Sequence, residues 1–115
     1  MQFSKALKLN HIFRRLYHKG NSRANRYLVI YARPNGSREN RVGLTVSAKL
    51  GHAVVRNRMR RRLREIYRLH EQEFLCGYDL VVVARAAATD APYKKLENAY
   101  LSLMAQLSVL KECEQ

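Results

Sequence analysis

The sequence is short of the residues on which several classes of protein depend. It has two cysteines in 115 residues, Cys76 and Cys113, without the C-x-x-C spacing or nearby histidine pair of a zinc site. We therefore expect reduced thiols and no disulfide framework. No apolar run approaches the roughly 20 residues needed to cross a bilayer. These absences argue against a disulfide-rich scaffold, a zinc site and a membrane-spanning protein.

Acidic residues are scarce in the first half of the chain. Residues 1–64 contain 17 lysines and arginines but a single acid, Glu39, whereas residues 65–115 contain five basic and eight acidic residues. The net charge of +13 is therefore concentrated in one part of the sequence. Such an excess repels itself in a compact fold and favours a polyanionic partner. RNA or DNA is a better match than an anionic membrane, because the arginine-dense segments contain no tryptophan.

Short elements alternate along the chain, without internal repeats, low-complexity tracts or an obvious linker. Apolar periodicity and turn residues predict three helices and three strands in one domain over residues 1–115. The predicted helices cover residues 11–18, between an Asn10 cap and Gly20, residues 53–74, ended by Gly77, and residues 92–111, opened by Pro92. The last of these has an apolar stripe of Leu96, Tyr100, Leu103, Leu107 and Leu110. The predicted strands cover residues 26–33, 41–48 and 78–84, with a turn at residues 34–37.

The lengths and composition of these elements predict how they are arranged. The short connection makes strands 26–33 and 41–48 antiparallel. The near-continuous apolar run over residues 78–84 is typical of a central strand buried on both faces. Strand 41–48, helix 53–74 and strand 78–84 have the lengths of a β-α-β unit, whose crossover is right-handed by the general rule.

The helix predicted over residues 53–74 carries most of the information about function. Val55, Met59, Leu63, Ile66 and His70 recur at three- and four-residue steps and form one stripe that faces a core. Seven arginines cover the rest of the helix and repel one another unless an anion is present. Their planar guanidinium groups suit bidentate binding of phosphate. The face opposite the stripe consists of Asn57, Arg60, Arg61, Arg64 and Arg68, and the residues beside the stripe are Arg56, Arg58 and Arg62.

A second candidate site combines the predicted first helix with the first strand. Phe13 and Tyr17 are four residues apart and share one face of the helix. Val29 and Tyr31 are two residues apart and share one face of the strand. If the two faces meet, they line a groove in which unpaired bases can stack without base-specific hydrogen bonds. The alternative for Phe13 is an ordinary core position.

Residues 41–65, RVGLTVSAKLGHAVVRNRMRRRLRE, resemble the signature of the bacterial ribonuclease P protein component. Other blocks of that family also match, so that the resemblance covers about residues 8–110. Ala48 stands where the family often has a second lysine, and His52 replaces a common asparagine. The matching positions are Phe13, Tyr17, Gly20, Ser22, Asn25 and Tyr31, then Arg41 to Ser47, Lys49, Gly51, Ala53-Val54, Arg56-Asn57, Arg60-Arg61, Arg64-Glu65 and residues 78–85.

The resemblance implies a fold and a set of partners. The fold is an α+β sandwich of the ribosomal-protein-S5-domain-2-like kind, in the order α-β-β-(β)-α-β-α, with a left-handed β-α-β crossover against the general rule. The partners are the catalytic RNA of ribonuclease P, bound one to one, and precursor tRNA, whose 5′ leader is removed in the bacterial cytoplasm. The RNA cuts the phosphodiester with Mg²⁺ that is bound mainly by the RNA itself, and no metal is expected to bind tightly to the protein alone. No membrane partner is expected.

The resemblance also assigns roles to residues, in agreement with the two candidate sites. The positions expected to bind the RNA subunit are Lys49, Arg56, Asn57, Arg58, Arg60, Arg61, Arg64 and Arg68. Those expected to bind the precursor leader are Phe13, Tyr17, Val29 and Tyr31.

The residues themselves predict no catalysis by the polypeptide alone. The chain has no Ser–His–Asp spacing, no HExxH, no P-loop and no paired acids in its basic half, whereas a protein nuclease needs metal-binding carboxylates or a general-base histidine. Two other classes stay open. A structural RNA-binding protein of ribosomal type would not need the stacking aromatics, and a helix-based transcription factor would need a dimerisation element that the sequence lacks.

Overall fold

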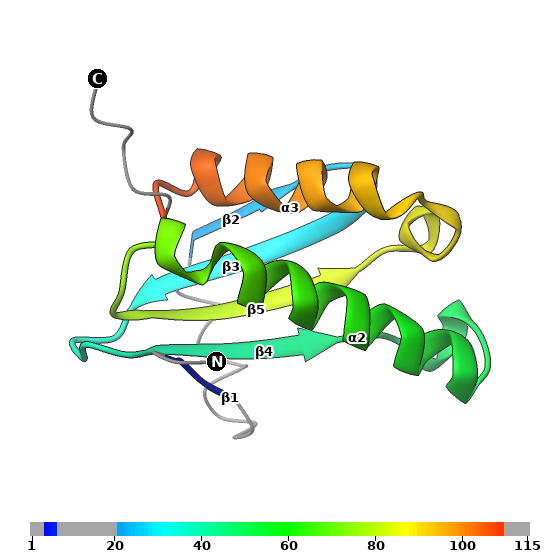
Figure 1. The fold of residues 1–115 in the computed structure, drawn as a ribbon, viewed down its shortest axis with the longest axis horizontal. Coiled ribbons are helices and arrows are strands. Elements are labelled where there is room, and N and C mark those ends of the chain that lie inside the picture. Colours follow the sequence, from blue (N-terminus) through cyan, green and yellow to red (C-terminus); the bar gives the residue numbers. More distant parts are fainter. Residues whose placement is uncertain (1–3, 7–20, 110–115) are drawn as a thin grey trace.

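The computed structural model describes residues 4–6 and 21–109 of the chain. The strands form one sheet in the order β1-β4-β5-β3-β2, and helices α2 and α3 lie on the same face of it (Figure 1). No helix in the described part of the chain is long and apolar enough to cross a membrane. The elements in chain order are β1 (Ser4–Ala6), β2 (Asn21–Ala24), β3 (Leu28–Pro34), β4 (Asn40–Thr45), η1 (Ala48–Leu50), α2 (Ala53–His70), η2 (Glu71–Glu73), β5 (Tyr78–Ala84), η3 (Ala86–Asp90) and α3 (Tyr93–Gln106).

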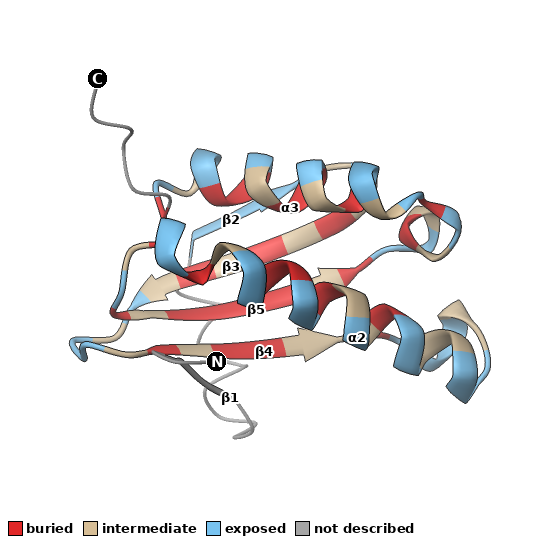
Figure 2. Cartoon of the chain, viewed as in Figure 1, coloured by how far each residue is buried: buried red, intermediate tan, exposed pale blue. Residues whose placement is uncertain are grey.

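The core lies between the two helices and the sheet. Strand β3 shows why, because its buried residues alternate with half-buried ones. On the helix side, Leu28 and Ile30 are fully buried, whereas Val29 and Tyr31 point to the opposite face and are half-buried. The buried residues of α2 and α3 lie on the sides of the helices that face the sheet (Figure 2).

The predicted apolar stripes of the two long helices are largely confirmed. On α2, Met59, Leu63 and Ile66 are buried as expected, and Tyr67, outside the predicted stripe, is buried beside them. Tyr67 joins an aromatic group, with its ring centroid 5.2 Å from that of Phe74, which in turn lies 6.2 Å from Tyr100 of α3. On α3 the buried residues are Leu96, Ala99, Tyr100, Leu103 and Met104, while Leu107 is half-buried and Leu110 lies outside the described residues.

Strand β5 is central, as its apolar run predicts. It pairs antiparallel with β3 and parallel with β4, and Val81 and Val82 are fully buried. Strands β3 and β4 run in opposite directions as predicted, but they are not neighbours because β5 lies between them. The connection over residues 35–39 is long enough to pass one intervening strand, a distance of about 10 Å.

The β4-α2-β5 crossover is left-handed. In Figure 1 both strands point to the right, β5 lies above β4 and α2 lies in front of the sheet. The general rule predicts the opposite hand, so that the pattern-based expectation is wrong and the one from the resemblance is confirmed. With α2 on this face, a right-handed crossover would place β5 beyond β4 and away from β3. The most apolar strand would then lose its central place between two partners.

Several boundaries differ from the predicted ones. The apolar pattern predicts neither β1 nor β2, because β1 has three residues and β2 is a polar, fully exposed strand without apolar alternation, whereas the order implied by the resemblance allows one further strand before α2. Helix α2 ends at His70, before the predicted residue 74. Gly77 serves a different purpose: its φ is +91°, and a Cβ there would lie 2.5 Å from the carbonyl oxygen of Ser37. The helix expected over residues 11–18, with Asn10 and Gly20, lies outside the described residues.

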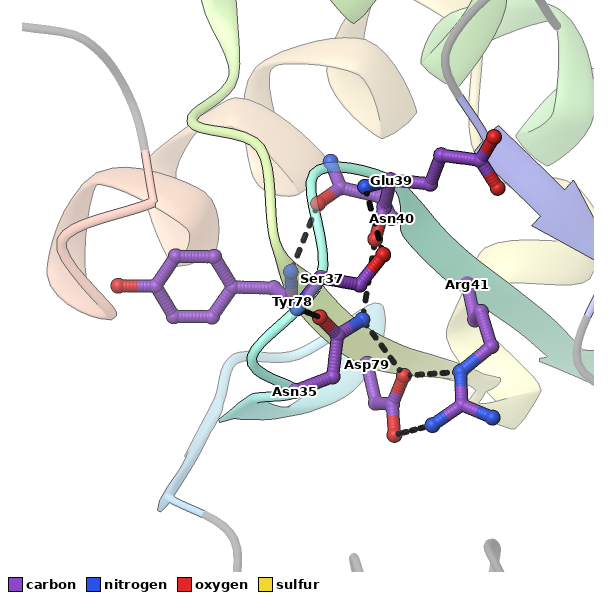
Figure 3. Close-up of polar contacts among 7 residues, drawn as sticks. All are labelled: Asn35, Ser37, Glu39, Asn40, Arg41, Tyr78 and Asp79. Carbon is purple, nitrogen blue, oxygen red and sulfur yellow. Dashed lines mark hydrogen bonds and ion pairs between the residues drawn. The ribbon is translucent and has the colours of Figure 1, made fainter.

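A polar network closes the end of the sheet where β3 leads into β4 (Figure 3). The amide of the buried Asn40 donates to the Tyr67 hydroxyl and to the carbonyl oxygen of Leu75, each at 3.0 Å, and its Oδ1 accepts from the backbone N–H of Tyr78 at 2.8 Å. One side chain thus joins β4, β5 and α2. Because its donors and acceptor are all bonded, burial of this amide carries no desolvation penalty from unmet groups.

A histidine links the end of α2 to α3. His70 Nε2 lies 2.9 Å from Glu97 Oε2, and its Nδ1 bonds Glu73. Burial alone would lower the pKa of His70, but the hydrogen bonds to Glu97 and Glu73 outweigh it and raise this pKa above the ordinary 6.5. The bond from His70, with help from Lys94, lowers the pKa of Glu97.

These two shifts predict how stability depends on pH. A raised folded-state pKa means that the His70 contacts stabilise fully below about pH 6.5 and lose their effect as pH rises through the folded pKa. The lowered pKa of Glu97 gives stability that is present above its ordinary 4.5 and lost as pH falls. We expect His70→Gln to destabilise the protein at pH 5.5 and to have little effect at pH 9, as measured by urea unfolding. The exposed His52 provides the control His52→Gln; a loss for His70→Gln that is equal at both pH values would contradict the assignment.

Candidate nucleic-acid interface

The arginines of α2 form an exposed surface on a helix that is fixed to the core. Burial of Met59, Leu63 and Ile66 holds the helix against the sheet, so that the residues on its other side face solvent. Lys49 is exposed on η1, which packs against α2. The predicted residues that are exposed are Lys49, Asn57, Arg58, Arg61, Arg64 and Arg68, and we call these six the α2 basic surface.

Three arginines of α2 are half-buried. Arg62 donates from Nη1 to the carbonyl oxygen of Ala91 at 3.0 Å, which ties the helix to the segment before α3. Arg60, predicted to lie on the face opposite the core, is half-buried and donates to Asn57 Oδ1 at 3.1 Å along the helix. Arg56 is the third, and its Nε is buried without a hydrogen-bond partner in the described residues. The arginines of α2 therefore divide into exposed and half-buried members, and this division does not follow the predicted one between the opposite face and the flanks of the apolar stripe.

The charge of the α2 basic surface is not neutralised within the described part of the chain. The ion pairs among the described residues have Arg41, His70 and Lys94 as their cations, and none has an arginine of α2. Arg61, Arg64 and Arg68 line a shallow hollow of about 250 Å³ together with Glu65. Three guanidinium groups around one hollow can donate hydrogen bonds to a bound anion from several sides.

The face of the sheet opposite the helices carries Val29 and Tyr31, the two candidates of the second predicted site that the structure describes. Val29 and Tyr31 share this face, as predicted, and Tyr31 pairs with Ser22 of β2 on one side and Val81 of β5 on the other. Tyr31 therefore stands on an interior strand of the sheet and not on an edge strand. Phe13 and Tyr17 lie outside the described residues, so that the meeting of helix and strand stays a prediction.

Arg33 belongs to this face and was missed in the sequence. It follows Tyr31 by two residues on β3, the spacing that places both side chains on one face. Its neighbour across the sheet is Asp79, but the Asp79 carboxylate is bound by Arg41, whose Nε and Nη2 each donate at 2.7 Å, and by Asn35 at 3.0 Å (Figure 3). Arg33 Nη1 is buried without a hydrogen-bond partner among the described residues. The alternation that identified Tyr31 could also have identified Arg33.

Comparison with known proteins decides the family. The family model for Ribonuclease P matches residues 1–108. The ribonuclease P protein component of Alkaliphilus oremlandii is 44% identical over 104 residues, which cover 90% of this chain and 91% of that protein. The chain belongs to the ribonuclease P protein component family. It is thus a subunit of the endoribonuclease that matures the 5′ ends of tRNA.

Solved structures of ribonuclease P proteins share the fold. The Staphylococcus aureus protein matches with a TM-score of 0.85 at 36% identity, over 92% of this chain and 97% of its own. The Thermotoga maritima protein matches with a TM-score of 0.82 at 29% identity, over 89% and 96%. Both agree with the predicted α+β class. Membership in the ribonuclease P family replaces the two alternatives, a ribosomal-type structural protein and a transcription factor.

The histidine, cysteine and acidic side chains of the described residues bear on whether this part of the protein could hold a metal ion. Residues 4–6 and 21–109 contain no group of three or more His, Cys, Asp or Glu side chains arranged to hold a metal ion. Asp79 is bound by Arg41 and Glu97 by His70, and Glu65 lines the α2 hollow beside three arginines, whose positive charge disfavours a metal cation. These residues therefore do not fit a metal site built from protein ligands.

Proposed function

We propose that this chain binds the catalytic RNA of ribonuclease P through the exposed side of α2. The observation that carries the proposal is a surface of arginines without carboxylate partners in the described residues, on a helix whose opposite side is locked into the core. Backbone phosphates would supply the missing negative charge, with release of counterions. The residues assigned to this contact are Lys49, Arg56, Asn57, Arg58, Arg60, Arg61, Arg64 and Arg68, of which Arg56 and Arg60 act from half-buried positions.

The face of the sheet opposite the helices is proposed to receive the 5′ leader of precursor tRNA. Val29 and Tyr31 support this, because they lie together on a half-buried strand face away from the main core. Phe13 and Tyr17 are assigned to the same site from the sequence. Stacking on aromatic rings tolerates any base, which suits an enzyme that processes many different leaders.

Catalysis and binding are assigned to different components of the enzyme. The proposal leaves hydrolysis to the RNA, with the Mg²⁺ that it holds, while the polypeptide binds and orients the two RNAs. The lack of a metal-binding donor set in the described residues supports this division. We further propose that one protein binds each RNA subunit and that the complex acts in the bacterial cytoplasm.

Cleavage of precursor tRNA tests the proposed role directly. At low Mg²⁺, where few metal ions offset the repulsion between phosphates, we expect addition of the chain to a cognate ribonuclease P RNA to raise the cleavage rate and to tighten binding of the precursor. The chain alone, treated with a nuclease to remove contaminating RNA, should not cleave at any Mg²⁺ concentration. Cleavage by the treated chain, or no effect of the chain on the RNA, would refute the proposal.

A further inference from the structure

A second basic hollow lies between the β2–β3 turn and α3. Its volume is about 310 Å³, and it includes no residue of α2. Four of its residues are Arg26 and Tyr27 on one wall and Lys95 and Asn98 on the other. Ser102 also lines the hollow, and together with Lys95 and Asn98 it recurs at three- and four-residue steps on one side of α3.

This hollow lies on the opposite side of α3 from α2. Glu97, which bonds His70 of α2, is two residues from Lys95, about 200° around the helix. Asn25, from the β2–β3 turn, contacts α3 away from Glu97, and its side-chain amide donates to the carbonyl oxygen of Ala99 at 3.1 Å. The hollow is therefore separate from the α2 basic surface.

The wall formed by the β2–β3 turn is held in place by hydrogen bonds. Asn25 Oδ1 accepts from the backbone N–H groups of Tyr27 at 3.0 Å and Leu28 at 2.9 Å. Arg85, which follows β5, donates from Nη1 to the carbonyl oxygen of Asn25 at 3.0 Å. Its backbone N–H donates to the carbonyl oxygen of Tyr27 at 2.9 Å. With the turn tied to α3 and to β5, a ligand would meet a preformed surface at little cost in ordering.

The hollow is positively charged and has no acid to balance it. Arg26 and Lys95 line it, and Arg85 lies at its turn. None of these three cations makes an ion pair among the described residues. The acid closest in sequence on α3 is Glu97, which is bound to His70 and Lys94.

The polar and aromatic groups of the hollow suit a nucleotide. The Arg26 guanidinium carbon lies 5.7 Å from the Tyr27 ring centroid, so that a flat cation stacks over the ring. Asn98 and Ser102 are exposed and offer amide and hydroxyl groups. Guanidinium and ammonium groups beside an aromatic ring and neutral donors are the set that contacts phosphate, sugar hydroxyl and base in RNA.

We propose that this hollow is a second RNA-binding site, which holds a phosphodiester segment at Arg26 and Lys95. The inference rests on the proposed binding of RNA by this chain and adds a contact on the other side of α3. The RNA could come from the catalytic subunit or from precursor tRNA, since both offer the same chemistry. A chain that grips RNA on two sides of its helical layer orients it better than one surface alone.

The test is the double variant Arg26→Ala/Lys95→Ala against the matched control Arg38→Ala/Lys94→Ala. Both remove two exposed positive charges, and Lys94 is the neighbour of Lys95 that instead faces Glu97. Binding is measured for ribonuclease P RNA alone and for precursor tRNA with the reconstituted enzyme, over a range of salt concentrations. We expect the test variant to bind one of the two RNAs about three- to tenfold more weakly, with a salt slope shallower by about one to two units.

The possible results distinguish binding of the catalytic RNA, binding of precursor tRNA and the absence of a second site. A loss with the isolated ribonuclease P RNA assigns the hollow to the catalytic subunit, and a loss confined to precursor tRNA assigns it to the substrate. Ser102→Asp, which adds a carboxylate to the hollow, should weaken the same RNA. If test and control variants behave alike for both RNAs while Arg61→Ala/Arg64→Ala loses affinity, the second site is refuted and the proposed function stands. No RNA binding by the unaltered chain would refute both.

Discussion

Arg61→Ala/Arg64→Ala is expected to bind ribonuclease P RNA on the order of 10- to 100-fold more weakly near physiological salt. Both arginines are exposed on α2 and line the same hollow. Each phosphate contact that is lost removes about 0.9 from the slope of log affinity against log salt, so that the double variant should have a slope shallower by about two units. Stability should change little, because neither side chain packs in the core.

Two comparisons make this result specific. Arg61→Lys/Arg64→Lys keeps the charge but removes the planar fork, so that it should retain the salt slope while losing part of the affinity. Arg38→Ala removes a single exposed charge from the loop between β3 and β4 and should change binding least. An unchanged salt slope for the double alanine variant would show that α2 does not contact the RNA backbone.

Tyr31→Ala is expected to reduce the affinity of the reconstituted enzyme for precursor tRNA by about five- to a hundredfold. The reason is loss of base stacking worth about 1–3 kcal/mol on the sheet face opposite the helices. Affinity for mature tRNA, which has no leader, should stay the same. The measurement is the ratio of the two affinities, because a general loss of folding would lower both together.

Tyr31→Phe is the matched control for this site. It keeps the ring at the same position between Ser22 and Val81, and it should keep the preference for precursor over mature tRNA. Urea unfolding of both variants shows whether the ring also stabilises the fold, since Tyr31 is half-buried. Equal affinity losses for both tRNAs, or no loss for either, would mean that this face does not bind the leader.

Much of the candidate site follows from local periodicity. The steps between Met59, Leu63 and Ile66 predicted which side of α2 is buried, and the alternation of β3 predicted that Val29 and Tyr31 share a face. Exposure of individual arginines was harder to predict. Arg62 is held by the carbonyl oxygen of Ala91 on the segment before α3, a contact that no helical wheel contains, whereas the bond from Arg60 to Asn57 joins helix neighbours three residues apart.

The sequence by itself determined five elements that the structure describes (α2, α3, β3, β4 and β5), the stripes and faces that they bury, the concentration of arginine on α2 and the resemblance to the family. These properties depend on the order of neighbouring residues, and the 3.6- and two-residue periods express them locally. The strand order did not follow in the same way. Insertion of β5 between β3 and β4, the left-handed crossover and the pairing of the polar β2 depend on how the whole sheet buries its most apolar strand.

Only the tertiary structure decided the contacts between distant segments. Asn25 meets the carbonyl oxygen of Ala99 across 74 positions of sequence, and Gly77 is required by the carbonyl oxygen of Ser37 and not by the end of a helix. The hollow between the β2–β3 turn and α3 exists because these segments pack together. Neither segment has a motif of its own, so that the shared positive charge of Arg26 and Lys95 became visible only when packing placed the two walls side by side.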